Sequence, residues 1–257
     1  MESRLAKELK LRLQPVAIIF TDEKPEGALQ YDKDTRGCVI AMLTAASEGK
    51  VVVFDRETTG CRGGKAGLGF GSDYGSFSGG FEYFLSTGRG PGYPEGEGYK
   101  KTPELAKAVK VTAEENLKRT QGRYTYVVFK PLAQLDPTRE TPQLVTFYAN
   151  PDQLSALVVL ANYDRPSNDN VILPFAAGCQ QVCMLPYQES FREQPRAVVG
   201  ITDISARPRV DADILSFTVP FKRFAEMEAN IPGSFLERKA WQKVVSRIPD
   251  PPALAAE

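Results

Sequence analysis

Short runs of apolar residues recur along the chain, and glycine, proline and polar residues separate them. The runs at residues 16–20 and 51–54 are continuous and too short for a helix, which is typical of buried strands. By this criterion the sequence predicts strands at residues 16–20, 51–54, 124–129, 144–148, 171–173, 197–201 and 214–219.

Longer segments carry apolar residues three or four positions apart, a spacing that places side chains on one face of a helix. Leu5, Leu9 and Leu13 show this spacing before Pro15. The helices predicted in this way cover residues 1–13, 39–46, 103–119 and 152–161, and a last helix carries Trp241.

Capping residues mark the starts of three of these helices. Asn150 is followed by Pro151 and, three residues on, by Gln153, which is typical of a capping box with proline in the first turn. Thr102 and Ser234 begin similar starts. Because helices and strands mix along the chain, we expect an α+β fold with one or more mixed sheets flanked by helices, in a single domain of residues 1–257.

The two halves of the chain have a similar order of elements. Residues 15–130 and 143–220 each run strand, helix, strand and then a Gly-Cys pair, which is Gly60-Cys61 in the first half and Gly178-Cys179 in the second. An internal duplication would place Cys61 and Cys179 at equivalent strand ends, close to each other. The alternative is that the similarity carries no meaning, because any α+β chain shows a partly repeated order of elements.

Composition narrows the class of protein. Lys and Arg together number 32, as do Asp and Glu, so the balanced charge argues against a nucleic-acid-binding protein. No apolar stretch is long enough to span a bilayer, and the first residues lack the apolar region of a signal peptide. We therefore expect a cytoplasmic protein without membrane contact, whose four cysteines are thiols or metal ligands.

The chain has no histidine, and three of its four cysteines directly follow a glycine. These three are Cys38, Cys61 and Cys179, and Cys183 follows four residues after Cys179. Without histidine, the commonest nitrogen ligand is missing. A soft-metal site would then be all-sulfur, or sulfur with carboxylate or solvent, which is typical of zinc and above all of iron–sulfur clusters.

The surroundings of the cysteines favour thiolates. Cys38 begins a predicted helix, where free N–H groups stabilise negative charge. Cys61 precedes Arg62, Gly63 and Gly64, which would bring positive charge and bare backbone to a bound cofactor. Cys179 and Cys183 would share one helical face.

The number of ligating cysteines would decide the kind of site. Three sulfurs would leave one iron of a cluster open to substrate, and four would close the site for electron transfer. The spacing of the four cysteines matches neither the two close cysteine pairs of a zinc ribbon nor the clustered cysteine motif of a ferredoxin. The alternative for each cysteine is a small buried apolar residue.

A glycine-dense segment at residues 60–80 is followed by aromatic residues. It lacks the spacing of a phosphate-binding loop and of a dinucleotide fingerprint. We expect these aromatic residues to be part of the hydrophobic core. The alternative is that they form a wall that excludes water from a redox centre. They are Tyr74, Phe77, Phe81, Tyr83 and Phe84. A metal-free small-molecule binding module, with this loop and these aromatic residues as its pocket, is therefore the alternative function. A third alternative is an assembly role for the loop at residues 88–98.

Several short motifs together resemble a known family. The first is Cys61-Arg62-Gly63-Gly64, and the others are Pro15-Val16-Ala17-Ile18, Cys38 with Ala41 and Ala45 behind it, Asn150-Pro151-Asp152-Gln153, Ala176-Ala177-Gly178-Cys179, and Asp211 and Asp213 before Val219-Pro220. Over residues 15–230 the chain resembles domain-of-unknown-function family 169, which is widespread in anaerobic bacteria and archaea. The resemblance implies a cysteine-bound centre and no particular reaction. A second-half Gly-Cys-x-Gly element is absent before Arg207, so Cys183 would replace its ligand or the site would be reduced.

The sequence therefore predicts an iron–sulfur protein of the 4Fe-4S type, with Cys38, Cys61, Cys179 and Cys183 as candidate ligands. Arg62, Gly63 and Gly64 would contact the cofactor. The expected function is electron transfer. The alternative is redox or Lewis-acid chemistry on a small molecule. The partners left open are a redox protein, a small molecule and a second copy of the chain.

Overall fold

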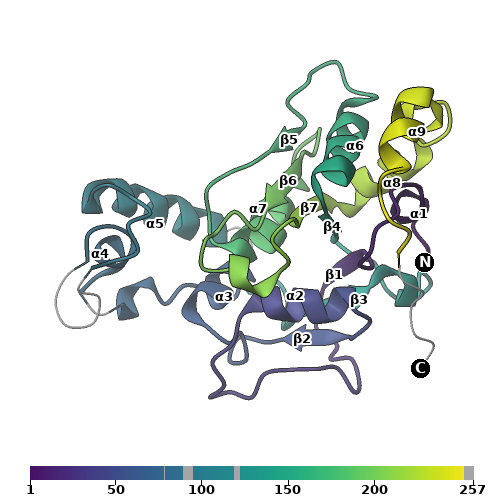
Figure 1. Cartoon of the computed structure of the whole chain (residues 1–257). Helices are drawn as coiled ribbons and strands as arrows, with labels where there is room; N and C mark the ends of the chain where they lie inside the picture. Colours follow the sequence, from purple (N-terminus) through teal and green to yellow (C-terminus); the bar gives the residue numbers. More distant parts are fainter. Residues whose placement is uncertain (78, 89–94, 119–121, 252–257) are drawn as a thin grey trace.

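The computed structural model describes residues 1–77, 79–88, 95–118 and 122–251. Within these ranges the strands form one seven-stranded sheet in the order β2-β3-β1-β4-β7-β6-β5 (Figure 1). Neighbouring strands are antiparallel except β5 and β6, which are parallel. The bounds are β1 (Val16–Thr21), β2 (Val52–Phe54), β3 (Tyr126–Pro131), β4 (Leu144–Ala149), β5 (Val171–Ile172), β6 (Ala197–Gly200) and β7 (Leu215–Pro220). The predicted α+β fold with a mixed sheet is confirmed.

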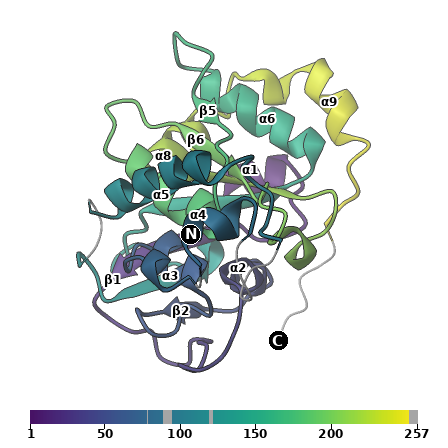
Figure 2. The same ribbon diagram turned by 90° about the vertical axis from the view of Figure 1, so that its left-hand side faces the viewer.

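Alternating side chains divide the sheet into two apolar faces, as the two-residue period of a strand requires. On β1, Ala17 and Ile19 join one buried cluster and Val16 and Ile18 join another. The first face carries α1 (Arg4–Glu8), α6 (Pro151–Asn162), α8 (Phe221–Ala229) and α9 (Lys239–Val245). The second face carries α2 (Val39–Ser47), the π-helical segment η3 (Gln180–Met184) and α7 (Leu185–Glu189). The sheet is thus enclosed between two helical layers (Figures 1 and 2).

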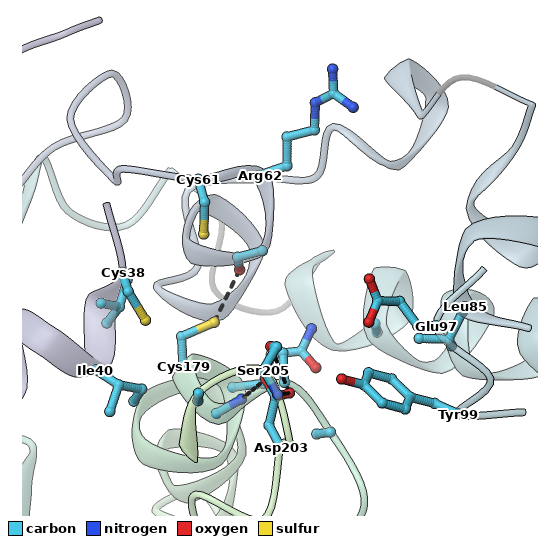
Figure 3. A pocket seen from close by; sticks show the side chains of 18 of the residues that line it. Cys38, Ile40, Cys61, Arg62, Leu85, Glu97, Tyr99, Cys179, Asp203 and Ser205 are labelled. Carbon is cyan, nitrogen blue, oxygen red and sulfur yellow. Dashed lines mark hydrogen bonds between the residues drawn. The ribbon is translucent and has the colours of Figure 1, made fainter. Parts of the chain in front are cut away.

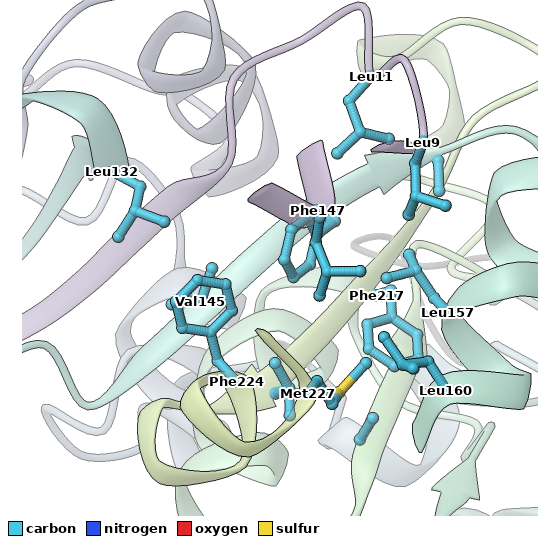
Figure 4. Packing of buried hydrophobic residues seen from close by; sticks show 14 of the residues in the cluster. Leu9, Leu11, Leu132, Val145, Phe147, Leu157, Leu160, Phe217, Phe224 and Met227 are labelled. Atoms are coloured by element: carbon cyan, nitrogen blue, oxygen red, sulfur yellow. The ribbon is translucent and has the colours of Figure 1, made fainter. Parts of the chain in front are cut away.

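Aromatic side chains anchor the core of the first face. The ring of Phe147 on β4 lies 5.9 Å from that of Phe224 on α8 and 6.4 Å from that of Phe217 on β7. All three residues are fully buried, and Leu157 and Leu160 of α6 pack beside them (Figure 4). This core lies on the side of the sheet away from Cys38, Cys179 and Cys183.

A smaller helical unit, which we call the arm, projects from the second face. It contains α4 (Phe81–Leu85) and α5 (Pro103–Lys118), which stand apart at the left of Figure 1. Together with α3 (Arg62–Gly67) and the short η1 (Tyr74–Ser76), the arm has its own apolar cluster. The other short turns are η2 (Leu132–Gln134), η4 (Arg207–Arg209) and η5 (Phe235–Glu237).

Most predicted elements are present, and the differences have local causes. The capping box of α6 is confirmed, with Asn150 and Gln153 bonding each other's backbone. The first helix ends at Glu8, not at residue 13, because the carbonyls of Leu9 and Lys10 turn away to accept hydrogen bonds from the Gln153 amide. The sequence pattern predicts no helix at α3, α4, α7 or α8.

The internal duplication stays a prediction. Strands β1 and β4, its two first strands, are antiparallel neighbours at the centre of the sheet. Helices α2 and α6, which the repeat would pair, pack on opposite faces. Of the loop at residues 88–98, residues 89–94 lie outside the described ranges. Among the described helices, none combines the length and apolar character needed to cross a bilayer.

Candidate functional site

A cavity of about 580 Å³ lies between the second face of the sheet and the arm. Cys38, Cys61 and Cys179 all line it, although they are far apart in the sequence. In Figure 3 their sulfur atoms point toward a common space. The fold therefore brings together three of the four predicted ligands.

Each of these cysteines lies at the start of a helical segment, Cys38 and Cys61 in extended conformation and Cys179 already in helical conformation. Cys38 precedes α2, Cys61 precedes α3 and Cys179 precedes η3. The N–H group of Gly64 donates a hydrogen bond to the Cys61 sulfur at 3.1 Å, and the Cys179 thiol donates to the carbonyl of Gly63 at 3.2 Å. Unpaired N–H groups at the start of a helix favour negative charge nearby.

Glycines before the first two cysteines allow their loops to touch. The N–H group of Gly37 donates to the carbonyl of Gly60 at 3.0 Å. A Cβ at Gly37 would lie 2.2 Å from the Tyr31 ring, and one at Gly60, where φ is +75°, would lie 2.9 Å from the Gly37 backbone. The Tyr31 hydroxyl in turn bonds both the N–H and the carbonyl of Cys38 at 3.1 Å. Glycine is thus required where these backbones meet.

The surroundings of Cys61 and Cys179 favour the protonated form of these two thiols. Burial raises the pKa of Cys61, the charge of Cys38 adds to this, and the N–H group of Gly64 opposes it. Burial also raises the pKa of Cys179, helped by the charges of Cys61 and Asp203. If all three cysteines lost their protons, the thiolates would repel one another, and a bound cation would be needed to stabilise them.

A polar group of residues lies on another side of the cavity. Asp203 accepts hydrogen bonds from the N–H group of Gly178 at 2.9 Å and from the N–H and hydroxyl of Ser205 at 3.0 and 2.8 Å. Glu97 and Tyr99 come from the arm (Figure 3). The pKa of Tyr99 is raised by burial and then by the charges of Glu97 and Asp203. The sequence reading missed these residues because no motif marks them and they meet only in the fold.

Four of the five predicted aromatic residues form the wall of the cavity on the arm side. They are Tyr74, Phe77, Phe81 and Phe84. The amide of Gln180 donates to the Tyr74 hydroxyl at 2.9 Å, which ties the wall to the segment after Cys179. The guanidinium of Arg62 lies 5.1 Å from the centre of the Phe77 ring, and its side chain points away from the sulfurs in Figure 3.

Of the remaining predicted site residues, one lines the cavity and two do not. Gly63 lines the cavity, whereas Gly64 is buried behind it and contacts Cys61 through its N–H group. Cys183 is fully buried in the apolar cluster of the second face and does not line the cavity. Burial raises its pKa well above the ordinary range.

The described residues contain no group of three or more His, Cys, Asp or Glu side chains placed to hold one metal ion. A single ion requires its sulfurs almost in contact, whereas each thiolate of a cluster binds a different iron and the sulfurs stay further apart. Cys38, Cys61 and Cys179 are the residues that could hold such a cluster.

Comparison with known proteins gives a family and no activity. The sequence model of DUF169, described as "Uncharacterised ArCR", matches residues 4–230. Searches of curated proteins and of solved structures found no significant match.

Proposed function

Since the chain belongs to the DUF169 family, whose description names no reaction, we propose from the site alone that the protein is an iron–sulfur protein with an open cluster. Cys38, Cys61 and Cys179 would be its three protein ligands. The observation that carries the proposal is that these three cysteines, which are far apart in the sequence, line one cavity.

Three ligands leave one iron facing the cavity. Cys183, the remaining cysteine, is a fully buried part of the apolar core, so it is not proposed as a ligand. When bound, such a cluster supplies Lewis-acid or one-electron chemistry to a small molecule at the open iron. The cavity beside the sulfurs supports this use over closed electron transfer, because it gives a substrate room next to the cluster.

The protein's own contribution is to hold the ligands and exclude water. The N–H group of Gly64 would stabilise the thiolate of Cys61. The aromatic wall, which includes the buried rings of Tyr74 and Phe81, covers the cavity on the arm side. An apolar surrounding tunes the potential of a cluster and protects it from solvent.

Anaerobic reconstitution with ferrous iron and sulfide tests the proposal. We expect a brown protein with broad absorbance near about 400 nm and about four irons and four sulfides per chain. Cys38→Ala, Cys61→Ala and Cys179→Ala should each reduce the bound iron. Cys183→Ala is the matched control, because it makes the same chemical change outside the cavity, and it should load normally. A colourless wild-type protein that retains less than about one iron per chain would reject the proposal.

A second function, a metal-free binding module, is favoured by the aromatic wall and the volume of the cavity. In that case the cavity would bind its ligand without iron, and Cys61→Ala would leave the binding intact. The same variants therefore separate the two functions once a ligand is available.

A further inference from the structure

The turn that follows β6 has a rare backbone conformation. Ile201 has a φ of +61° and is fully buried in the apolar cluster of the second face. A β-branched residue seldom adopts a positive φ, because its side chain then crowds the backbone, so the surrounding structure must hold it there. Strained residues of this kind cluster at functional sites. The residues that this turn presents to the cavity are therefore candidates for a role in the site.

Gln181, a fully buried residue of η3, holds the turn in place. Its carbonyl oxygen accepts a hydrogen bond from the N–H group of Thr202 at 3.1 Å. Its amide nitrogen donates to the Thr202 hydroxyl at 2.6 Å and to the carbonyl of Pro174 at 2.7 Å. One side chain thus joins the turn after β6, the loop before Cys179 and η3.

Asp203, two residues after Ile201, connects this turn to the loop that carries Cys179. It is only 8% exposed and lines the cavity. Its Oδ2 accepts a hydrogen bond from the N–H group of Gly178 at 2.9 Å. Its Oδ1 accepts hydrogen bonds from the N–H group and the hydroxyl of Ser205 at 3.0 and 2.8 Å. Both carboxylate oxygens are therefore engaged, and the side chain is fixed between the turn and the loop.

Close packing transmits the position of Gly178 to the next residue, Cys179. A Cβ at Gly178 would lie 3.1 Å from the Cβ of Ala206, so the two backbones are close together. On its other side, the Cys179 thiol donates to the carbonyl of Gly63 at 3.2 Å. The position of the Cys179 sulfur therefore depends on contacts that begin at the Asp203 carboxylate.

We propose that Asp203 is a positioning residue for Cys179. Its carboxylate holds the N–H group of Gly178 and so directs the sulfur of the next residue toward the space that Cys38 and Cys61 also face. The inference deepens the proposed function and rests on it for the bound cluster. The placement of Cys179 itself is a property of the metal-free protein.

Alkylation of the metal-free, full-length protein tests this placement. Asp203→Asn keeps the shape of the side chain but has only one accepting oxygen, so it loses the hydrogen bond from Gly178 or those from Ser205. The protein is treated with iodoacetamide, and the modified cysteines are identified by mass spectrometry. We expect Cys179 to react at least about tenfold faster in this variant than in the wild type, because a loosened loop exposes its sulfur. Cys183, in the apolar core, should react at an unchanged rate.

Two further variants complete the test. Ser205→Ala removes only the hydroxyl bond to Asp203, at an exposed position, so the fold should be retained and Cys179 should react a few-fold faster. Asp213→Asn makes the same chemical change at an exposed residue that does not line the cavity, and it should react like the wild type. Unchanged labelling of Cys179 in both Asp203→Asn and Ser205→Ala would overturn the inference. An equal increase at Cys179 and Cys183 in both variants would also overturn it.

The iron-loaded protein gives a separate readout. Asp203→Asn should retain less iron after reconstitution. It should also raise the midpoint potential of the cluster in a redox titration, because it removes a negative charge from the cavity. Asp213→Asn should change neither quantity.

The two proposals fail separately. If the wild type binds no iron, the proposed function is lost, and the labelling of Cys179 decides this inference. If the wild type assembles a cluster and Asp203→Asn changes neither the labelling, the iron content nor the potential, the function stands and the role of Asp203 is rejected.

Discussion

Cys61 and Cys179 bind opposite sides of one peptide unit. The Cys179 thiol donates to the carbonyl of Gly63 at 3.2 Å, and the next N–H group, that of Gly64, donates to the sulfur of Cys61 at 3.1 Å. With ordinary C=O and C–N bond lengths, the two sulfurs are at most about 9 Å apart. The first turn of α3 therefore sets the distance between two of the proposed ligands.

Gly67→Ala should disturb this arrangement strongly. A Cβ at Gly67 would lie 2.3 Å from the Cys179 sulfur and 2.9 Å from the Cys179 backbone, so α3 or η3 must move. We expect a loss of about 1–3 kcal/mol in the free energy of unfolding of the metal-free protein, measured by urea denaturation. Gly63→Ala is the control in the same helix. Its Cβ would meet nothing closer than 3.9 Å, and alanine should stabilise the helix by up to about 1 kcal/mol. Equal effects of the two variants would contradict this packing.

The convergence of Cys38 and Cys61 was predictable because a glycine directly precedes each of them. Gly37 and Gly60 precede Cys38 and Cys61, and their backbones bond each other in the fold. A residue type that permits close approach of two backbones leaves a signal in the sequence even when the contact is long-range. The periodic segments were predictable for the usual reason, that one buried face selects apolar residues at a fixed spacing.

The polar side of the cavity was not predictable from one sequence. Glu97, Tyr99 and Asp203 have no common spacing, and only the folded chain brings them to one cavity. The separation of Cys183 from the other cysteines was also hidden. A spacing of four residues is compatible with one helical face, but it does not tell which residue faces the cavity and which the core.

Alkaline conditions should destabilise the metal-free protein through its buried thiols. Burial raises the pKa of Cys183 and Cys179 in the folded protein, so the unfolded chain releases these protons at lower pH. The stabilisation is complete below about pH 8.5, the unfolded value, and is lost as the pH rises above it, by up to about 1.4 kcal/mol per pH unit and thiol.

Urea denaturation under reducing conditions, from about pH 8 to about pH 10, measures this effect. Cys183→Ala removes one of the thiols, so its free energy of unfolding should fall less steeply with pH than that of the wild type. Identical slopes would show that Cys183 ionises normally in the fold.

The stability of the fold should depend on the ion pairs that the buried Arg223 forms on the first face of the sheet. Its side chain is 1% exposed and donates hydrogen bonds to Asp164 and Glu226. The pKa of Asp164 is held well below its usual range, mainly by the Arg223 hydrogen bond. The stabilisation from this pair is therefore complete above about pH 4, the unfolded value, and is lost progressively as the pH falls toward the lowered pKa.

At neutral pH, Asp164→Asn should cost about 2 kcal/mol of stability. This is less than for a fully buried pair, because the Asp164 side chain is 33% exposed and Glu226 remains. Asp152→Asn breaks the pair with Arg247, whose side chain is 66% exposed, and should cost a small fraction of this. Thermal unfolding of the two variants compares the pairs, and equal losses would contradict the difference in burial.

Iron should stabilise the fold if the three cysteines hold a cluster. A centre that binds the folded chain and not the unfolded one raises the midpoint of thermal unfolding by mass action. Reconstitution of the wild type should therefore raise the midpoint by several degrees, measured anaerobically by circular dichroism. Cys61→Ala and Cys179→Ala should lose this increase, because each removes a ligand on one side of the Gly63–Gly64 peptide. Cys183→Ala should start from a lower midpoint, since it opens a gap in the core, and still show the full increase. An increase that survives Cys61→Ala, or one that disappears in Cys183→Ala, would assign the iron to other residues.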